Sequence, residues 1–440
     1  MSAQDETAVQ HGRLRRRGTV GFAFTLVAVV AAVVLVSTSS VAAIATWQVV
    51  QHARPTVSLA MPGAASANPA PALTAQSGEV NMLLVATDTR DGQGAGFDDA
   101  ANRQASSGVG NNDTNILVHI SADHSNMAVV SFPRDLVVPI PACTNDQGSV
   151  TPATSAAMLN TALSRGGEQH GLACVASTIS QLTGLQVDYA GKVTFDGVVA
   201  MATAIGGVEV CLATPIHDDD VTPALDLQPG LRTLTGAQAA AFLRSRHGVG
   251  DRSDLGRISN QQTFMAALAR QTVSAGTLTN PAKVLRLADT AFRNMVLSDT
   301  LSDPATLARI ALAVNTVGLA NMVFVQYPVY DDPDAAGRVL VSPGAADALD
   351  AALRANQPVQ LGADSLGRAA VVDPSADPSS PAAPSRPAGP SGGAGAGAAT
   401  GTPSAAVGAP DAASAPPSAA ALPDNVSGQR ADTVTCAARK

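Results

Sequence analysis

Between about residues 79 and 356, apolar and polar positions alternate in ways that predict both strands and helices. Residues 80–86 form an apolar run of strand length. Two more apolar runs, residues 116–120 and 127–131, are joined by the turn-forming residues 121–125, which is typical of a β-hairpin. The sequence therefore predicts an α/β (α+β) sandwich with a central mixed sheet flanked by helices. Further strands are expected at residues 208–212 and 322–327, and helices at residues 158–163, 172–182, 195–205, 235–243, 257–272 and 345–353.

The pattern changes at both ends of the chain. A nearly uncharged apolar stretch, residues 19–46, is long enough to span a bilayer as a helix, which needs about 20 residues. Arginines precede it, so the positive-inside rule places residues 1–18 in the cytoplasm and the rest of the chain outside, on a single-pass membrane anchor. A cleaved signal peptide is the competing interpretation. Residues 47–78 are interpreted as a stalk, 357–429 as a disordered tract rich in Pro, Ala, Gly and Ser, and 430–440 as a cysteine-containing tail.

Charge and cysteine content indicate which partners the protein can have and whether it contains disulfides. The formal net charge is −8 and the sequence pI is about 5.3, which argues against a nucleic acid partner. Four cysteines in an exported chain suggest two disulfides, for which three pairings exist. We favour Cys143–Cys174 and Cys211–Cys436, and the second of these would tie the tail to the folded domain. The cysteines lack the spacing of a zinc site.

The hairpin allows a geometric prediction. If its turn centres on residues 123 and 124, residues whose numbers add up to 247 lie opposite each other. Asp113 and Arg134 satisfy this sum, so we expect them to face each other at the open end of the hairpin. Asp88 and Arg90 follow the apolar run at residues 80–86 and can reach the same edge. We therefore expect these four charged side chains to converge.

A group of arginines in an acidic chain is the strongest chemical signal. Arg244 and Arg246 share one side of an extended segment, whereas Arg257 and Gln261 share one helix face. The rigid fork of donors on a guanidinium suits phosphate geometry, so this segment is interpreted as a phosphate or pyrophosphate site. The alternative is a surface loop held by salt bridges.

Nearby polar residues leave more than one role open. Asp251 and Asp254 would be the salt-bridge partners in a surface loop, or supports behind the arginines in an anion site. His247 fits either a general base or an exposed loop residue. Residues 218–220, three consecutive aspartates, are interpreted as a solvated loop and not as a calcium site.

The two aspartates at the expected strand edge suggest a metal. Two carboxylates a few ångströms apart repel each other unless a cation or a proton lies between them. Beside an arginine cluster, Asp88 and Asp113 are therefore expected to hold Mg²⁺ (or Mn²⁺) that also contacts phosphate oxygens. Capping of loops by aspartate is the alternative.

Several motifs occur in one order between about residues 79 and 275. Together they resemble the LytR-CpsA-Psr family, and the composition and cysteine tail resemble an actinobacterial member. The motifs are Leu83-Leu-Val-Ala-Thr-Asp88-Thr-Arg90, Asn112-Asp113-Thr114, Ser131-Phe-Pro-Arg134-Asp135, Leu159-Asn160 with Gly166-Gly167, Ile205-Gly-Gly-Val-Glu-Val, and Arg244-Ser-Arg-His-Gly with Asp254-Leu-Gly-Arg257.

The resemblance implies a membrane-anchored, extracytoplasmic phosphotransferase. Such an enzyme moves a glycopolymer from a polyprenyl-pyrophosphate carrier onto peptidoglycan. The alternatives are a non-catalytic module that binds polyprenyl phosphates and a lipid-linked pyrophosphatase. The resemblance implies Asp88 and Asp113 as Mg²⁺ ligands, Arg134, Arg244, Arg246 and Asp113 as catalytic residues, and Arg90, Arg134, Arg244, Arg246, Arg257 and Gln261 as pyrophosphate ligands.

Overall fold

The computed structural model describes residues 55–60, 72–74, 77–91, 106, 108–274, 277, 280–373 and 419–439. Within these ranges, no helix combines the length and the apolar character that a membrane span requires. The predicted cytoplasmic tail at residues 1–18 and the predicted span at 19–46 lie outside the described residues, as does most of the predicted stalk.

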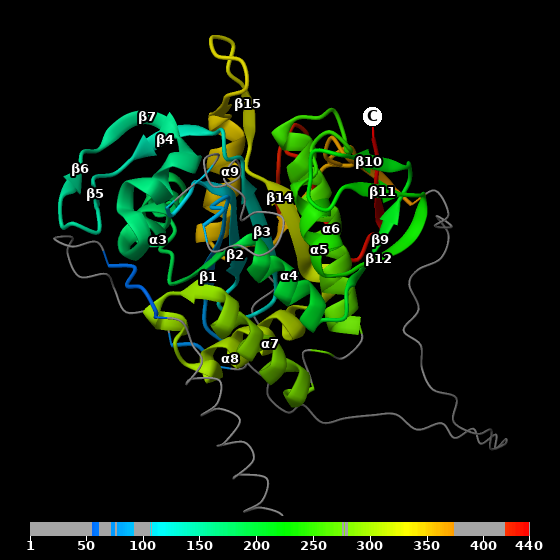
Figure 1. The fold of residues 1–440 in the computed structure, drawn as a ribbon, viewed down its shortest axis with the longest axis horizontal. Helices are drawn as coiled ribbons and strands as arrows, with labels where there is room; N and C mark the ends of the chain where they lie inside the picture. Colours follow the sequence, from blue (N-terminus) through cyan, green and yellow to red (C-terminus); the bar gives the residue numbers. More distant parts are fainter. Residues whose placement is uncertain are drawn as a thin grey trace, which may run out of the picture. The chain divides into compact units, whose positions relative to one another are not determined.

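A seven-stranded mixed sheet forms the centre of the fold (Figure 1). Its strand order is β13-β8-β1-β2-β3-β14-β20. The three middle strands form an antiparallel meander, β8 and β14 run parallel to β1 and β3, and the two edge strands are antiparallel to their neighbours. The strands are β1 (Val80–Thr87), β2 (Asn112–Ile120), β3 (Met127–Phe132), β8 (Tyr189–Val193), β13 (Met295–Leu297), β14 (Met322–Gln326) and β20 (Gly428–Arg430).

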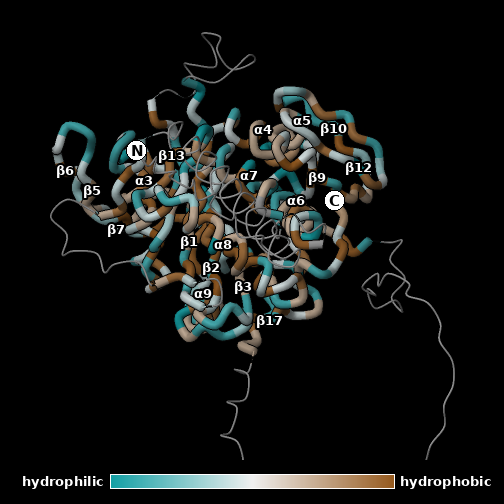
Figure 2. Tube along the Cα trace, turned by 90° about the horizontal axis from the view of Figure 1, so that it is seen from below, coloured by the Kyte–Doolittle hydropathy of each residue, from teal (hydrophilic) through white to brown (hydrophobic). Residues whose placement is uncertain are grey.

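Alternate residues of the middle strands serve opposite faces of this sheet. Leu83 and Val85 of β1 are fully buried in the larger hydrophobic core, together with Leu117, the cross-strand partner of Leu83. The intervening Leu84 and its partner Ile116 line a cavity on the other side. Figure 2 shows hydrophobic colouring along β1 and β2. Both faces are apolar, so each needs a cover of other elements.

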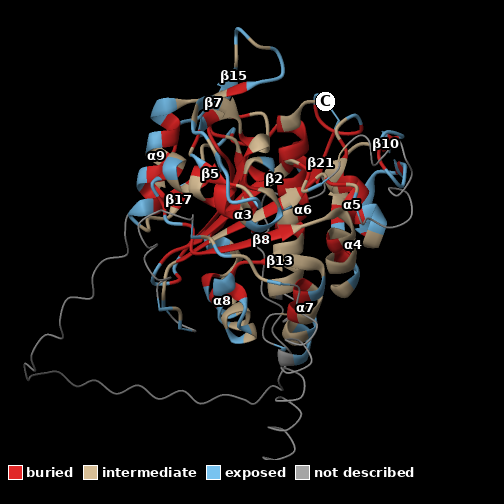
Figure 3. Cartoon of the chain, turned by 60° about the vertical axis from the view of Figure 1, so that its left-hand side comes forward, coloured by how far each residue is buried: buried red, intermediate tan, exposed pale blue. Residues whose placement is uncertain are grey.

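Helices α3 (Ala162–Thr183) and α9 (Pro343–Arg354) cover the first face. Buried leucines of both helices, together with Ile179 of α3, belong to the same core as β1 and β2. Figure 3 shows that α9 is buried on one side and exposed on the other, as expected of a surface helix. Helix α3 ends just before Gly184, which has a φ of 72°, a left-handed conformation that favours glycine.

Three helices cover the second face: α4 (Phe195–Ala204), α5 (Gly236–Arg244) and α6 (Asp254–Ser274). A four-stranded sheet of order β12-β9-β21-β18 shares a second hydrophobic core with them. This layer holds α6 between the two sheets. The strands are β9 (Val208–Leu212), β12 (Gly230–Leu234), β18 (Ala370–Val372) and β21 (Thr435–Ala437).

Five two-stranded sheets and two more α-helices complete the described part of the chain. They are β4 (Val137–Ile140) with β7 (Thr154–Met158), β5 (Cys143–Thr144) with β6 (Val150–Thr151), β10 (Ile216–Asp218) with β11 (Leu225–Leu227), β15 (Val329–Asp331) with β16 (Val339–Val341), β17 (Val359–Gln360) with β19 (Ala420–Ala421), and helices α7 (Pro281–Asn294) and α8 (Pro304–Val317).

The predicted helix at residues 158–163 is wrong in its first half. Met158 ends β7, a 3₁₀ turn follows at Leu159–Thr161, and α3 begins only at Ala162. The backbone amides of Leu159 and Asn160 donate to carbonyls of the segment that follows β3, at 2.8 and 3.0 Å. These tertiary hydrogen bonds replace the helical ones that the local pattern suggested.

The C-terminal tail returns to the fold over a longer stretch than we expected. β20 extends the central sheet beside β14, and β21 lies between β9 and β18. The tract 357–429, predicted to be disordered, contributes β17, β18, β19 and β20 at its two ends. Averaging composition over the whole tract hid these short apolar segments. Residues 374–418 lie outside the described residues.

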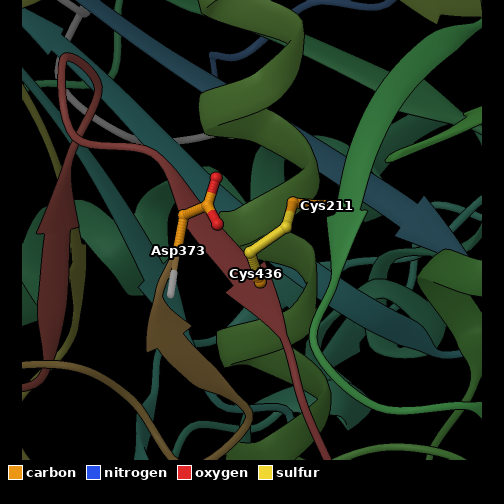
Figure 4. A group of neighbouring side chains, drawn as sticks. All are labelled: Cys211, Asp373 and Cys436. Atoms are coloured by element: carbon orange, nitrogen blue, oxygen red, sulfur yellow. A yellow bond between two sulfur atoms is a disulfide. The ribbon is translucent and has the colours of Figure 1, made fainter. Parts of the chain in front are cut away.

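Both predicted disulfides are present. Cys143–Cys174 joins β5 to α3 with a Cα–Cα distance of 5.6 Å. Cys211–Cys436 joins β9 to β21 at 4.4 Å between Cα atoms, where the two residues are partners in the strand register. Figure 4 shows this bond with Asp373 beside it. Because the two sulfur atoms are bonded to each other, this group of three residues is not a metal site.

Candidate functional site: an arginine-lined cavity

A cavity of about 520 Å³ lies between the central sheet and helices α4, α5 and α6. Its apolar wall comes from both layers: Leu84 and Ile116 from the sheet, and Val198, Leu243 and Met265 from the three helices. Its polar wall contains every site residue that the sequence predicted. These are Asp88, Arg90, Asp113, Arg134, Arg244, Arg246, Arg257 and Gln261.

The predicted pairing of Asp113 with Arg134 is confirmed. The strand register runs from Asn115 opposite Phe132 to Ile120 opposite Met127, so the residue numbers add up to 247 throughout. Two positions beyond this ladder, Nη1 of Arg134 donates to both carboxylate oxygens of Asp113, at 2.9 and 3.0 Å. The hairpin thus places one cation and one anion at the rim of the cavity.

Asp254 interacts with three of the arginines. Its Oδ1 atom lies 2.7 Å from Nη2 of Arg257, 3.2 Å from Nη2 of Arg246 and 3.6 Å from Nε of Arg134. Arg257 also donates to the backbone carbonyl of Asp113 at 2.8 Å. Asp254, the first residue of α6, is only 10% exposed, which strengthens its interactions with the three guanidinium groups.

Charges in this group shift the affinity of its members for protons. Burial lowers the pKa of Arg246, and the neighbouring charges of Arg257 and Arg134 lower it further. Burial also opposes the charge of Arg134, but Asp113, Asp135 and Asp254 outweigh it and raise the pKa of Arg134. These three guanidinium groups lie among three carboxylates, those of Asp113, Asp135 and Asp254. Two further arginines line the same cavity, and five guanidinium groups around one cavity favour an anionic ligand.

Arg244 and Arg90 lie over one aromatic ring. The guanidinium carbon of Arg244 is 4.3 Å from the centroid of Phe195, and that of Arg90 is 5.5 Å from it. Burial lowers the pKa of Arg244 to about 10, and the charge of Arg90 adds to this effect. Arg244 remains protonated at neutral pH, so both side chains present positive charge to the cavity.

Asp88 is held by the chain that follows it. Its Oδ1 atom accepts hydrogen bonds from the hydroxyl of Ser106 at 2.8 Å and from the amide of Asn111 at 2.7 Å. Gly110, with a φ of +70°, packs so closely that an added Cβ would lie 2.7 Å from the same oxygen. This glycine is therefore needed for the observed position of the Asp88 carboxylate.

Gln261 and Asn260 connect helix α6 to the end of helix α5. The side-chain amide of Gln261 donates to the carbonyl of Leu243 at 2.9 Å, and that of Asn260 donates to the carbonyl of Phe242 at 2.8 Å. Both acceptors directly precede Arg244. These bonds fix the segment that carries Arg244 and Arg246 relative to α6.

The two acidic neighbours of the arginines have different roles. Asp254 supports the arginines as expected. Asp251 instead pairs through its Oδ2 atom with Nη1 of Arg368 at 2.9 Å. Arg368 lies in the tract 357–429, which the sequence predicts to be disordered, so this partner is not predictable from the sequence.

The acidic loop at residues 218–220 is only partly solvated. Asp218 is 2% exposed and accepts hydrogen bonds from the hydroxyl of Ser245 at 2.5 Å and the amide of Gly248 at 3.2 Å. It therefore holds the arginine segment from the other side. The exposed Asp220 lies 2.6 Å from Nδ1 of His247, and both line the cavity.

Sequence reasoning missed Phe195 and the buried role of Asp218. Phe195 is the first residue of α4, directly after Thr194, whose side chain caps the helix. The chain contains only nine Phe residues, and one placed at a helix start was the available signal. Its contact with Arg90 and Arg244 depends on segments far apart in the sequence.

Fold and site together define an α/β protein whose mixed sheet and three helices enclose an arginine-lined cavity. Residues 43–353, more than half of the chain, match the LytR_cpsA_psr family, and the chain belongs to this family. The family expected from the motifs is thus confirmed.

Similar proteins carry cell-wall names. The chain is 31% identical over 270 residues to the cell wall biosynthesis protein LcpA of Corynebacterium glutamicum, covering 58% of this chain and 51% of LcpA. It is 28% identical over 206 residues to the polyisoprenyl-teichoic acid–peptidoglycan teichoic acid transferase TagU of Oceanobacillus iheyensis, covering 47% of this chain and 55% of TagU. A LytR-Csp2A-Psr enzyme from Actinomyces oris of known structure has a TM-score of 0.47 and 21% identity, covering 69% of this chain and 96% of that one. The chain spans about half the length of the curated relatives it matches.

Proposed function

We propose that this protein is a phosphotransferase that moves a glycopolymer from a polyprenyl-pyrophosphate carrier onto peptidoglycan. The observation that carries the proposal is one cavity with an apolar wall and a polar rim that contains five arginines and four aspartates. Membership of the LytR_cpsA_psr family supports it, as do the cell-wall names of LcpA and TagU.

The two parts of the cavity match the two parts of such a carrier. The polyprenyl chain would lie against the apolar wall formed by Leu84, Ile116 and the facing helices. The pyrophosphate would lie at the rim, among the guanidinium groups of Arg134, Arg246 and Arg257. A ligand with one hydrophobic and one strongly anionic end satisfies both surfaces at once.

In the transfer step, a hydroxyl oxygen of peptidoglycan attacks the phosphorus that carries the glycopolymer. A new phosphorus–oxygen bond forms, the bridging bond to the distal phosphate breaks, and polyprenyl phosphate leaves. The product is a phosphodiester. Phosphoryl transfer depends mainly on positioning and charge stabilisation, so Arg134, Arg244 and Arg246 would act by neutralising the charge on the transferred group.

The attacking hydroxyl must lose its proton to a base. His247 lies at the cavity beside Arg246, and Asp220 holds its ring through Nδ1 at 2.6 Å. We assign the base role to His247, oriented by Asp220. Its side chain is 58% exposed, which suits an acceptor that arrives from solvent as part of a polymer.

The donor set at the rim fits a hard divalent cation. Asp88 and Asp113 both line the cavity, and each presents carboxylate oxygens, the ligands that Mg²⁺ prefers. Asp88 is positioned by Ser106 and Asn111, and Asp113 by Arg134. When bound, Mg²⁺ or Mn²⁺ would neutralise charge on the phosphate oxygens.

We also propose that the domain lies outside the cytoplasm on a single-pass membrane anchor formed by residues 19–46. Two disulfides in the folded part support an oxidising location.

The decisive experiment measures transfer of a lipid-linked glycopolymer to peptidoglycan. Arg134→Ala and Arg246→Ala should each lower transfer at least 100-fold while the melting temperature changes little. Arg338→Ala, an exposed arginine that does not line the cavity, is the matched control. Undiminished transfer in both site variants would refute the proposal.

Asp113→Ala distinguishes the enzyme from a binding module and from a pyrophosphatase. Lost transfer with retained binding of polyprenyl pyrophosphate supports the enzyme, whereas unchanged function supports the module. Release of free sugar phosphate by the wild type, with no bond to peptidoglycan, would indicate a pyrophosphatase. Chelation of divalent cations should abolish transfer, and added Mg²⁺ or Mn²⁺ should restore it.

A further inference from the structure

The part of the chain beyond the family match returns to the arginine segment. The match ends at residue 353, and the described residues after it include 365–373 and 428–439. We call these two stretches the strap. They supply β18 and β21, which pair with each other, and β21 also pairs with β9 (Figure 4). All three strands contact helix α6.

The first contact of the strap is with the loop between Arg246 and Asp254. The amide of Gly250 in this loop donates to the carbonyl of Ala438 at 2.9 Å. Gly250 has a φ of +51° and Arg252 a φ of +66°, which is costly for a residue with a side chain. The loop therefore needs contacts with other parts of the chain to keep this conformation.

The second contact is an ion pair. Nη1 of Arg368 lies 2.9 Å from Oδ2 of Asp251. The other oxygen of Asp251 accepts a hydrogen bond from the amide of Ser253 at 3.1 Å, and the hydroxyl of Ser253 accepts one from the amide of Gly256 at 3.0 Å. This chain of bonds runs from the strap into the first turn of α6, which carries Asp254.

The third contact is with the far side of helix α6. The amide of Ala369 donates to the buried hydroxyl of Ser259 at 3.1 Å. Gly367 packs on the same side chain, where an added Cβ would lie 2.5 Å from the hydroxyl oxygen. Ser259 is two residues after Arg257, so the two side chains project from roughly opposite sides of the helix. One side of α6 faces the cavity and the other rests on the strap.

The strap is itself anchored away from these contacts. Nη1 of Arg270, near the end of α6, donates to the carbonyls of Ala431 and Thr433, both at 3.0 Å. The Cys211–Cys436 disulfide ties β21 to β9. A displacement of the strap at the arginine loop would thus have to break bonds along its whole length.

We propose that the strap positions the arginine cluster, and that Arg368 is a positioning residue for the anion site. Arg134, Arg246 and Arg257 repel one another around Asp254, so their close spacing needs support from behind. The strap supplies this support through Gly250, Asp251 and Ser259. The inference rests on the proposed function in one respect, since it takes the ligand to be a pyrophosphate.

The test compares binding of inorganic pyrophosphate by calorimetry in the full chain and in two charge variants. Arg368→Gln should weaken binding two- to fivefold without a matching fall in melting temperature, because it removes only exposed ion pairs, those with Asp251 and Asp331. Arg430→Gln is the control: Arg430 lies in the strap and pairs with Asp432, away from the loop. Equal affinities in Arg368→Gln, Arg430→Gln and the wild type overturn the inference.

A second pair of variants removes the strap's anchor. Cys211→Ser with Cys436→Ser should speed amide hydrogen exchange at residues 248–256, whereas Cys143→Ser with Cys174→Ser should leave these amides protected. Equal exchange in the two double variants overturns the inference. If the wild type fails to bind pyrophosphate, the proposed function is refuted, and the amide exchange alone decides the role of the strap.

Discussion

The same strands form both faces of the central sheet, but the two faces are covered in different ways. On the face covered by α3 and α9, Leu83 and Leu117 are fully buried in a continuous apolar core. On the face covered by α4, α5 and α6, Leu84 and Ile116 border a cavity of about 520 Å³. Neighbouring residues of one strand therefore have different surroundings: Leu83 lies in a closed core, and Leu84 borders an open cavity.

The polar groups differ in the same way. On the closed face, the hydroxyl of Tyr327 donates to the buried carboxylate of Asp350 at 3.0 Å. On the open face, Arg134, Arg246 and Arg257 form a network with Asp113, Asp135 and Asp254. A buried pair of partners stabilises a fold, whereas a network of charged groups at the rim of a cavity can bind a ligand.

The largest expected effect separates neighbouring residues on β1. Leu83→Ala should lower the free energy of unfolding by about 3 kcal/mol, because it leaves a void in the closed core. Leu84→Ala should cost less stability and should instead weaken binding of a polyprenyl phosphate. Chemical denaturation and lipid binding, measured on both variants, check this. Equal losses of stability would contradict the division between the faces.

An intermediate effect concerns the closed face and pH. Burial raises the pKa of Asp350 to about 7, although the hydrogen bond from Tyr327 and the charge of Arg354 oppose this. The folded protein then binds a proton that the unfolded chain loses above about pH 4. Stability therefore falls as pH rises from 4 to 7, with a slope of at most about 1.4 kcal/mol per pH unit. Asp350→Asn should remove this part of the slope, as denaturation at several pH values would reveal; an unchanged slope would contradict the assignment.

The smallest effect tests the open face. Phe195→Leu removes the ring under Arg244 and Arg90 but keeps an apolar side chain. Affinity for pyrophosphate should fall about threefold, in line with the usual strength of a cation–π contact. Tyr330→Leu, an exposed aromatic that does not line the cavity, is the control. The prediction is wrong if both variants bind like the wild type.

The sequence was informative wherever the geometry is local. The position of Asp113 opposite Arg134 followed from counting residues around one turn. The shared face of Arg257 and Gln261 followed from helical spacing. The site residues were also recognisable from their motifs, because each motif lies within one short stretch of the sequence.

Non-local contacts were not predictable in the same way. Phe195 contacts Arg90, which lies more than a hundred residues earlier in the chain, and Arg244, which lies on a different helix. The partner of Asp251 is Arg368, from a region whose composition suggested disorder. Short strands such as β18 and β21 carry too few residues for a periodic signal, and their pairing decides their structure.

The length of the turn between β2 and β3 determines whether Asp113 and Arg134 lie opposite each other at the rim of the cavity. Surface turns commonly accept insertions, but this one fixes the count of residues between Asp113 and Arg134. One residue added between Ser121 and Asn126 would shift every cross-strand pair by one place or force a bulge. Either outcome would separate the ion pair or turn a buried leucine outward. Variation in the length of this short turn should thus be rare, although the turn itself contacts neither of the two charged side chains.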